Sequence, residues 1–588
     1  MDTITMENIN SLWASLIVEE LVRNGIRYFC ISPGSRSAPL TVAAARHPKV
    51  KTSIIYDERG AAFHALGYAR AAGTSAAVIA TSGTAVANYL PAVVEASMDN
   101  IPLLILSADR PPELQQTGAN QTILQPGIFG QFVRWHFEFP APDEKIPPAV
   151  ALSTVDQAVY RALRKPSGPV HLNFMFREPL APERQPLPSN YLSGIADWQT
   201  RETPFTSYEQ MCRSPQKDQL KKLAALLNQT KRGLVTVGRL DSPEQERAVK
   251  KLAHELNWPL FPDVLSGLRL GNSLFSRIPY YDQMLASEAF QAHLAVETLL
   301  HFGGQLTSKR FLQFTEKYPP ENMIVVKEHP FRHDPACRVS WRIEAPIAAL
   351  ARDLIPMIHS GAEPKWVQTL VRQSGQVVQV VDDFFKKQIN ISEPGIARII
   401  SQKIREHDGL FLAGSMPVRD MDSFGLPDAK KPAVAANRGT SGIDGTISTA
   451  IGFAAGLRKP ATLLTGDLAF LHDLNALSTL RFISQPVLIV LINNQGGGIF
   501  SFLPIAEFKD VFEEYFAAPH PFTFEKVSEM FGIDYYSPKN PEAFSQIYDK
   551  ARGSQKHALI EIRTAREANV QRHQDLQKLI VRKLETLL

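Results

Sequence analysis

The sequence predicts an α/β protein built from doubly wound parallel sheets, in about three domains. At 588 residues the chain has the length of about three ordinary domains. Its composition, 44% hydrophobic and 21% charged, is typical of a globular protein. Apolar runs of strand length alternate with helical patterns, which is the arrangement of parallel sheets covered by helices.

Charge and cysteine content argue against a nucleic-acid partner and indicate a reducing compartment. The net charge is only +4 and no long Lys/Arg block occurs, so nucleic-acid binding has little support. Cys30, Cys212 and Cys337 are scattered, without metal-ligand spacing, which suits a reducing compartment. The first ten residues, MDTITMENIN, lack a secretory pattern, and no segment reaches membrane-spanning length. We expect a cytoplasmic protein without a membrane or nucleic-acid partner.

In the first third, four apolar runs are each followed by a helical pattern. The runs cover residues 26–31, 52–56, 76–80 and 102–107. Carboxyl ends of parallel strands meet at one edge of a sheet, where ligands bind. The loops after these runs carry Ser35, Arg36, Glu58, Thr81, Ser82, Gly83 and Arg110. We expect these residues to share one edge of the first sheet.

Prolines then mark a linker, and weaker motifs follow. Pro179, Pro182, Pro186 and Pro188 interrupt the chain between the first and second predicted domains. Strand candidates at 234–237, 297–302 and 323–326 predict a second α/β layer, and residues 366–387 have the pattern of an amphipathic connecting helix. The expected divisions are a first domain at 1–180, the linker at 181–215, a middle domain at 216–360, the connecting helix at 361–392 and a last domain at 393–588.

The last third contains the most informative stretch, residues 461–500. Its strand candidates are 410–413, 433–435, 461–464 and 487–492, and a helical pattern at 571–588 closes the chain. The last two strands end at Thr465-Gly466-Asp467 and at Asn493-Asn494. The interval between them has room for a helix at about 472–480 and a return strand, which makes a parallel βαβ unit.

These two strand ends predict a metal and diphosphate site. The Asp467 carboxylate, the Asn494 amide oxygen and a carbonyl of the Gly496-Gly497-Gly498 turn are the oxygen ligands that Mg²⁺ prefers. The glycines permit close backbone approach, and the helix after Asp467 offers its N-terminus to an anion. The alternative is a helix-capping Asp beside an ordinary glycine turn.

This stretch resembles the signature of thiamine-diphosphate-dependent enzymes, Gly-Asp followed after some two dozen residues by Asn-Asn. The segment IIYDERGAAFHALGYA likewise resembles the glutamate segment of their pyrimidine domain. The resemblance implies pyrimidine, middle and diphosphate domains in that order, with thiamine diphosphate and Mg²⁺ as cofactors and Mn²⁺ as a substitute. It also implies at least a homodimer, with a tetramer as the alternative, because two subunits of such enzymes share one cofactor.

Six further segments narrow the resemblance to the carboligase branch that serves menaquinone or phylloquinone synthesis. They are ISPGSRSAPL, SADRPPELQQTGANQTI, LTSKRFLQ, NRGTSGIDGT, GDLAFLHDLNAL and NNQGGGIFSFLP. This branch decarboxylates 2-oxoglutarate and adds the product 1,4 to isochorismate, so the resemblance implies a transferase acting on these two substrates.

The resemblance also implies roles for individual residues. Glu58 activates the cofactor from the opposite nitrogen of its pyrimidine ring, although on local sequence it could equally be a glutamate favoured by a helix N-terminus. Asp467, Asn494 and the Gly496 carbonyl hold the metal, and Ile443 holds the cofactor in its bent conformation. The implied cofactor-binding residues are Glu58, Thr81, Ser82, Gly83, Gly442, Ile443, Gly466, Asp467, Leu468, Ala469, Asn494, Gly496, Gly497, Gly498 and Ile499.

Both implied substrates are dicarboxylates, so guanidinium groups should bind them. Arg36, Arg110, Arg419 and Arg438 are all expected in loops after strands, against the alternative of solvated surface arginines. The implied substrate-binding residues are Ser35, Arg36, Arg110, Gln121, Lys309, Arg310, Ser415, Arg419, Arg438, Ile499, Phe500 and Leu503.

Three competing functions remain at this point. An acetohydroxyacid-synthase-like or pyruvate-oxidase-like enzyme would share the fold and usually binds FAD in its middle domain. A dinucleotide-dependent dehydrogenase would also be α/β, but no G-x-G-x-x-G follows a predicted strand here. A non-catalytic binding protein would not need both Glu58 and the metal motif.

Overall fold

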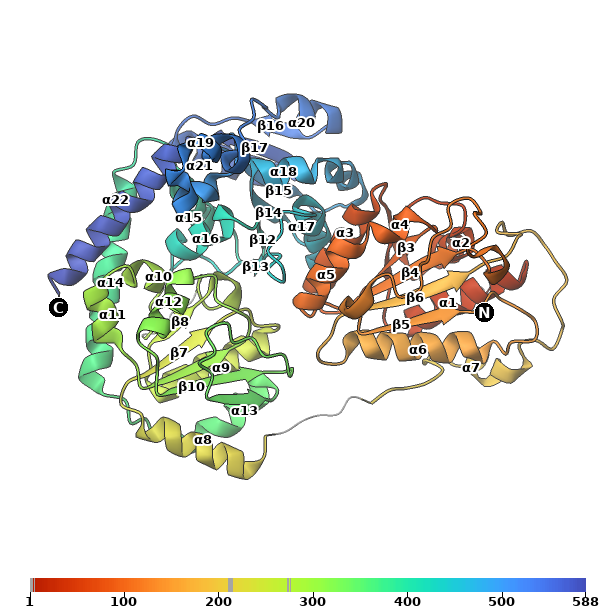
Figure 1. Cartoon of the computed structure of the whole chain (residues 1–588), viewed down its shortest axis with the longest axis horizontal. Coiled ribbons are helices and arrows are strands. Elements are labelled where there is room, and N and C mark those ends of the chain that lie inside the picture. The colour runs from red at the N-terminus through yellow and green to blue at the C-terminus, as the bar shows by residue number, and fades with distance from the viewer. Residues whose placement is uncertain (1–3, 5, 210–214, 272–273, 275, 588) are drawn as a thin grey trace. The chain divides into compact units, whose positions relative to one another are not determined.

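The computed structural model describes residues 4, 6–209, 215–271, 274 and 276–587, in two compact units. The first unit comprises Met1–Met211, Asn437–Ala461 and Ala469–Val487, and the second comprises Cys212–Ala436, Thr462–Leu468 and Leu488–Leu588. Cys212, the end of the expected linker at 210–214 and the final residue of the expected C-terminal helix lie outside the described residues. Figure 1 colours the chain by residue number.

The first unit contains a parallel sheet in the order β2-β1-β3-β4-β6-β5. Every residue of β3 and β4 is buried, as expected for central strands covered on both faces. The strands are β1 Tyr28–Ile31, β2 Lys51–Ile54, β3 Ala76–Ala80, β4 Leu103–Asp109, β5 Trp135–Phe139 and β6 Pro169–Met175. The helices of this region are α1 Ile9–Arg23, α2 Ala38–Arg46, α3 Glu58–Ala72, α4 Thr84–Ala87, α5 Leu90–Met98, α6 Ala149–Leu163 and α7 Ala196–Thr200.

Helix α3 is packed closely against α17 (Thr446–Leu457) within the first unit. A Cβ on Gly67 would come within 2.0 Å of the Thr449 carbonyl oxygen, and one on Gly452 within 1.9 Å of the His64 carbonyl oxygen. Asp57 caps the start of α3 by accepting from the Arg59 and Gly60 amides, and Gly73 ends it with φ of 65°. The glycines therefore set the distance between the helix that starts at Glu58 and its neighbour.

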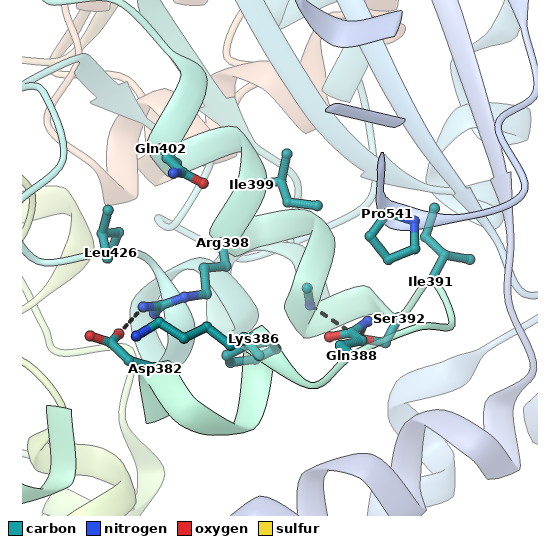
Figure 2. Close-up of a pocket in the computed structure, with 12 residues that line it drawn as sticks. Asp382, Lys386, Gln388, Ile391, Ser392, Arg398, Ile399, Gln402, Leu426 and Pro541 are labelled. Atoms are coloured by element: carbon teal, nitrogen blue, oxygen red, sulfur yellow. Dashed lines mark hydrogen bonds and ion pairs between the residues drawn. The ribbon is translucent and has the colours of Figure 1, made fainter. Parts of the chain in front are cut away.

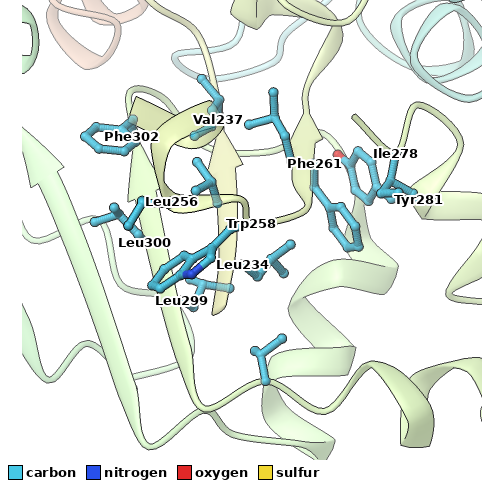
Figure 3. Close-up of a cluster of buried hydrophobic side chains, with 14 of the residues drawn as sticks. Leu234, Val237, Leu256, Trp258, Phe261, Ile278, Tyr281, Leu299, Leu300 and Phe302 are labelled. Carbon is cyan, nitrogen blue, oxygen red and sulfur yellow. The ribbon is translucent and has the colours of Figure 1, made fainter. Parts of the chain in front are cut away.

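The second unit contains two sheets, of which the first has the order β11-β10-β9-β7-β8. Its strands are β7 Gly233–Val237, β8 Leu260–Pro262, β9 Thr298–Phe302, β10 Asn322–Lys327 and β11 Trp341–Glu344. Its helices are α8 Lys217–Gln229, α9 Pro243–Leu256, α10 Tyr281–Met284, α11 Glu288–Leu294, α12 Lys309–Lys317, α13 Ile347–Leu354 and α14 Pro364–Lys386. Figure 3 shows the core of this sheet, where Trp258 lies among Leu234, Leu256 and Leu299.

The C-terminal helix α22 (Arg566–Glu585) packs into this same core. Leu576, Ile580 and Leu584 of α22 are fully buried members of the cluster that contains Trp258. Helices α14 and α22 run alongside each other in Figure 1. The buried face of α14 includes Trp366, Leu370 and Val377, at the helical spacing that its sequence predicts. The last segment of the chain thus stabilises the middle sheet.

The third sheet has the order β13-β12-β14-β15-β17-β16, which repeats the topology of the first. Its strands are β12 Gly409–Leu412, β13 Ala433–Ala435, β14 Ala461–Gly466, β15 Val487–Asn493, β16 Asp534–Tyr536 and β17 Ala558–Arg563. The remaining helices are α15 Glu393–Lys403, α16 Met416–Phe424, α18 Asp467–His472, α19 Lys509–Val511, α20 Glu525–Phe531 and α21 Pro541–Gly553. The strand order reverses between β1 and β3 in the first sheet and between β12 and β14 in the third. Ligands of doubly wound sheets bind at such reversals.

The expected fold class is confirmed, with differences in detail. The expected helix at 472–480 is wrong, because α18 begins directly at Asp467 and a 3₁₀ helix follows at Leu474–Phe482. The chain turns at Asp473, whose buried carboxylate accepts from the Ser448 amide at 2.7 Å. Strands β5, β6, β8, β11, β16 and β17 had no sequence-based prediction.

The contact between Gly233 and Trp258 gives a test of the middle core. A Cβ on Gly233 would lie 2.0 Å from the Trp258 ring, which is fully buried and cannot move freely. We expect Gly233→Ala to lower the stability of this region by about 1–3 kcal/mol, as overpacking does. Thermal unfolding of the purified variant measures it.

The control is Gly375→Ala in α14, where an added Cβ meets no atom within 4 Å. Alanine is the better helix former, so this variant should be as stable as the parent or more stable. An unchanged midpoint for Gly233→Ala would contradict the packing described here.

Candidate functional site

At the third sheet, Asp467 and the glycine turn meet where β14 and β15 end. The Gly496 amide donates a hydrogen bond to Asp467 Oδ2 at 3.0 Å, and the Leu468 amide donates to Oδ1 at 2.7 Å. Asp467 is 2% exposed. The adjacency of the two strands therefore brings the expected carboxylate and glycine turn into contact, as the spacing predicts.

Asn494 presents an amide oxygen that has no protein partner among the described residues. This Oδ1 atom is buried, while Nδ2 donates to Oε1 of Glu393 at 3.0 Å. The preceding Asn493 differs, because its Nδ2 donates to Glu561 at 2.7 Å and its Oδ1 accepts from the Gln495 amide at 3.2 Å. A buried acceptor without a donor is costly, so the Asn494 oxygen is suited to a ligand.

The glycine turn requires glycine at its first position. Gly496 has φ of +150°, and a Cβ there would lie 2.2 Å from the Ala517 carbonyl oxygen. The Gly497 amide donates to that same oxygen at 2.6 Å. The Gly496 carbonyl accepts from the Gly498 amide at 3.0 Å and keeps a second lone pair.

Electrostatics at this edge favour a cation. Burial raises the pKa of Asp467, and the Gly496 hydrogen bond and the nearby His520 oppose that rise. His520 Nε2 lies 3.3 Å from Asp467 Oδ2 and was not predicted as a site residue. A carboxylate, an amide oxygen without a partner and a carbonyl with a spare lone pair fit a divalent cation such as Mg²⁺.

No group of three His, Cys, Asp or Glu side chains forms a metal cluster within the described part of the chain. The expected ligand set contains only one such side chain, so this absence does not test it. Over the same residues, no helix is both long and apolar enough to cross a membrane.

At the first sheet, Glu58 is the first residue of α3 and is half-buried. Asn88 Nδ2 approaches Glu58 Oε2 at 3.4 Å. After β3, Ser82 is buried and its hydroxyl has no partner among the described residues, while the Gly83 amide donates to Gln125 Oε1 at 2.9 Å. Gln125, fully buried and not predicted, therefore holds the turn that follows β3.

Another unpredicted residue, Glu95 of α5, holds the loop that carries Arg438, Gly442 and Ile443. The buried Glu95 carboxylate accepts from the Gly439 amide at 2.8 Å and from the Thr440 amide at 2.7 Å. Ile443 is 37% exposed, and one guanidinium nitrogen of Arg438 is buried with no partner among the described residues. A cavity of about 320 Å³ beside this loop is lined by residues that include Phe63, Glu95, Thr440 and Gly442.

The expected arginines have different surroundings. Arg36 is buried, donates to the Phe176 carbonyl at 3.0 Å and lies 3.2 Å from Glu178 Oε1. Arg110 donates to the Asn120 carbonyl at 2.9 Å. Arg310 contacts Asp282 and Gln577, each at 2.7 Å, and Lys309 beside it is exposed.

One expectation about the arginines is wrong, because Arg419 lies in helix α16 and not in a loop. The chain turns at Ser415, which has φ of 66°, and Pro417 stands in the first turn of the helix that starts at Met416. Proline is well placed there because it needs no hydrogen-bond partner. Arg419 therefore points from the first turn and donates to the Ser415 carbonyl.

The other expected residues lie on the same two edges. Gln121 Nε2 donates to the Ser82 carbonyl at 3.1 Å, which joins its loop to the turn after β3. Ser35 is exposed in the loop between β1 and α2, and Thr81 is buried at the end of β3. Gly466 and Ala469 flank the start of α18, and Ile499, Phe500 and Leu503 follow the glycine turn, with Leu503 38% exposed.

A larger cavity lies where α14 ends and α15 begins. Figure 2 shows Arg398 of α15 pointing at Asp382 of α14 in this cavity of about 370 Å³. Arg398 is already held by Asp382, by the Tyr280 hydroxyl at 2.9 Å and by the Phe424 carbonyl at 3.3 Å. None of its lining residues was expected from the sequence, and its arginine serves the structure of the second unit.

Three family models match the chain in succession. They are the thiamine pyrophosphate enzyme N-terminal TPP binding domain at residues 13–128, the middle domain of thiamine pyrophosphate enzymes at 189–412 and the C-terminal TPP binding domain at 424–562. Together with the sheet edges described above, these matches define a thiamine-diphosphate-dependent enzyme.

Similar proteins of known name indicate which thiamine-diphosphate-dependent enzymes this chain resembles. Proteins named 2-succinyl-5-enolpyruvyl-6-hydroxy-3-cyclohexene-1-carboxylate synthase match at 47% identity in Rubrobacter xylanophilus, over 96% of this chain and 98% of the relative. Those of Prosthecochloris aestuarii and Salinibacter ruber match at 45% and 43%, each over 98% of this chain and 99% and 98% of the relative. The chain belongs to the family of 2-succinyl-5-enolpyruvyl-6-hydroxy-3-cyclohexene-1-carboxylate synthases.

The geometry of Asp467 leads to a prediction about cofactor binding. Asp467→Ala removes the one charged side chain of the expected metal-ligand set, so we expect Mg²⁺-dependent binding of thiamine diphosphate to be lost. Calorimetric titration of the cofactor, with and without Mg²⁺, measures this.

The matched control is Asp408→Ala, which removes a buried carboxylate before β12, at the opposite edge of the same sheet. Asp408 is paired with Arg552, so this variant should lose stability and keep its cofactor affinity. Parental affinity in Asp467→Ala would show that the metal assignment is wrong.

Proposed function

We propose that this protein decarboxylates 2-oxoglutarate and joins the remaining four-carbon unit to isochorismate by 1,4-addition, with thiamine diphosphate and Mg²⁺ as cofactors. Mn²⁺ substitutes for Mg²⁺, and the active form is a cytoplasmic homodimer or a tetramer. The names of the relatives support the reaction, and one observation of this chain supports the cofactor site: the Asn494 oxygen is buried without a partner among the described residues, next to a strand end that bears Asp467 and Gly496.

The metal and the diphosphate are held by the third sheet. Asp467, Asn494 and the Gly496 carbonyl are the proposed metal ligands. The amides of Gly496, Gly497, Gly498 and Leu468 already donate within the protein, so the diphosphate is proposed to be held mainly through the metal. The contacts that support this arrangement are the Asp467–Gly496 hydrogen bond and the glycine requirement at position 496.

Thiamine diphosphate supplies a carbon nucleophile at C2 of its thiazolium ring. Glu58 is proposed to hold a proton at the pyrimidine nitrogen, where a carboxyl group supports the cofactor's own amino group as the base. Its position at the start of α3, fixed by the Asp57 cap and the glycine contacts with α17, supports this role. The exposed Ile443 side chain is proposed to keep the cofactor bent.

Arginines are proposed to bind the substrate carboxylates. Arg438 has a buried guanidinium nitrogen without a partner among the described residues, and Arg419 points from the first turn of α16. Polar contacts come from Ser35, Gln121 and Ser415, and Ile499, Phe500 and Leu503 form an apolar wall. Arg36, Arg110, Lys309 and Arg310 complete the proposed set.

The test is an incubation of the protein with 2-oxoglutarate, isochorismate, thiamine diphosphate and Mg²⁺, with the product identified by mass. The proposal expects the adduct of both substrates with loss of one CO₂. Product formation from pyruvate alone, with none from this pair, would favour an acetohydroxyacid-synthase-like enzyme instead.

The proposed role of Glu58 leads to a prediction. Glu58→Gln preserves side-chain shape but cannot serve as an acid, so the variant should bind thiamine diphosphate and lose activity. The direct readout is hydrogen–deuterium exchange at C2 of the bound cofactor, which should slow. Unchanged exchange would rule out the proposed role of Glu58.

The same variant tests the proposed sharing of a cofactor between subunits. Glu58→Gln and Asp467→Ala dimers, mixed and allowed to exchange subunits, should regain activity because a mixed dimer contains one intact site. No recovery after demonstrated exchange would mean that each chain supplies both groups to its own site.

Another prediction concerns Arg419 and Arg438. A carboxylate paired with a fixed guanidinium is worth roughly 1.5–3 kcal/mol, and about 1.4 kcal/mol corresponds to a factor of ten. Replacing either arginine with Ala should therefore raise the Michaelis constant of one substrate about ten- to hundredfold, with little change in cofactor affinity. Lysine should restore it only in part.

Steady-state kinetics with each substrate varied in turn measures the effect. Arg398→Ala, which removes an arginine of the cavity in Figure 2, is the matched control and should lower stability without a selective change in either Michaelis constant. Equal, small effects on both substrates would place Arg419 and Arg438 outside the site.

A further inference from the structure

Glu393 is a buried carboxylate that lies outside the sequence motifs from which the site was predicted. It is the first residue of α15 and is 1% exposed. Its Oε1 atom accepts two hydrogen bonds, from Asn494 Nδ2 at 3.0 Å and from the Thr564 hydroxyl at 2.9 Å. The three residues come from α15, from the end of β15 and from the segment after β17, so the contact joins separate parts of the second unit.

The partner of Asn494 determines which of its two amide atoms faces the strand end. An asparagine amide has a donor end and an acceptor end of similar shape, and a rotation by half a turn exchanges them. A carboxylate oxygen only accepts hydrogen bonds, so Glu393 stabilises the orientation in which the NH₂ group faces α15. The oxygen then faces away from Glu393, where it is buried without a partner among the described residues.

Asn493 provides a contrast within the same sequence. A buried carboxylate, Glu561, also holds its NH₂ group, but the Asn493 oxygen accepts from the Gln495 amide. Asn493 is thus satisfied at both ends and shapes the turn. Asn494 is satisfied only at the end that Glu393 holds.

We propose that Glu393 is a positioning residue for the metal, which orients the Asn494 amide so that its oxygen is the atom presented to Mg²⁺. This inference rests on the proposed function, because it takes Asn494 as a metal ligand. Hydrogen-bond partners of metal ligands fix ligand orientation, and their loss commonly weakens metal binding by about ten- to hundredfold. Without Glu393, the Asn494 amide could present its NH₂ group to the cation.

The test is the Mg²⁺ affinity of the protein in the presence of thiamine diphosphate, measured by calorimetric titration. Glu393→Ala should weaken Mg²⁺ about ten- to hundredfold, and kcat should recover at saturating Mg²⁺ because the reacting groups are unchanged. Glu393→Gln, whose amide oxygen can still accept from Asn494, should come within a fewfold of the parent. Parental Mg²⁺ affinity in Glu393→Ala, with only a lower thermal midpoint of the apoprotein, would overturn the proposal.

If Glu393→Ala does not fold, a second test exchanges the carboxylate and the amide between positions 393 and 494. Asn494→Asp alone places two carboxylates in contact and should weaken Mg²⁺ binding. Combining it with Glu393→Gln reverses donor and acceptor at unchanged total charge, so this double variant should bind Mg²⁺ more tightly than Asn494→Asp. Equal affinities in the two would contradict an orienting hydrogen bond.

Thr564→Val is the matched control, because it removes the second donor to the same Glu393 oxygen and leaves the Asn494 contact in place. Its Mg²⁺ affinity should stay within about threefold of the parent, well below the loss expected on removing an orienting partner.

Asn494→Ala separates the two proposals, the metal site and the positioning role of Glu393. If it leaves Mg²⁺ affinity unchanged, the metal assignment is wrong. If it weakens Mg²⁺ while Glu393→Ala does not, only the positioning role is wrong.

Discussion

The hydrogen bond from the Gly496 amide to Asp467 is the contact on which the site depends. It joins the ends of β14 and β15 at 3.0 Å, and it holds a carboxylate that is almost completely buried. Burial raises the pKa of this carboxyl group, so the site is favourable only when donors or a cation compensate its charge. The backbone amides of Gly496 and Leu468 supply two such donors. The proposed cation would compensate the remaining negative charge.

The first and third sheets each position a set of loops at the carboxyl ends of their strands. The two sheets have the same strand order, and in each the loops after neighbouring strands carry the residues of interest, after β3 in the first sheet and after β14 and β15 in the third. Buried side chains then fix the loops: Gln125 holds the turn after β3, Glu95 holds the loop at 438–443, and Glu393 holds Asn494. These three residues fix the loops that carry the proposed site.

Local patterns predicted much of this arrangement. The apolar runs that end at Asp467 and Asn493 placed both strand ends correctly, because a buried strand needs continuous apolar residues and a polar residue marks its end. The buried side chains that hold the loops could not be predicted from local patterns. Glu393 and Asn494 are 101 positions apart, and Glu95 and Gly439 are 344 apart, so no local spacing connects them. Arg419 was misplaced because the turn at Ser415 starts a helix sooner than the apolar pattern indicates.

The central claim is that the edge formed by β14 and β15 holds the metal. A crystal grown with thiamine diphosphate and Mn²⁺ tests it directly, because anomalous scattering locates Mn²⁺ independently of any assumed ligand. We expect one strong peak at bonding distance from Asp467, from the Asn494 oxygen and from the Gly496 carbonyl oxygen. A peak bonded to other residues, with none at this edge, would contradict it.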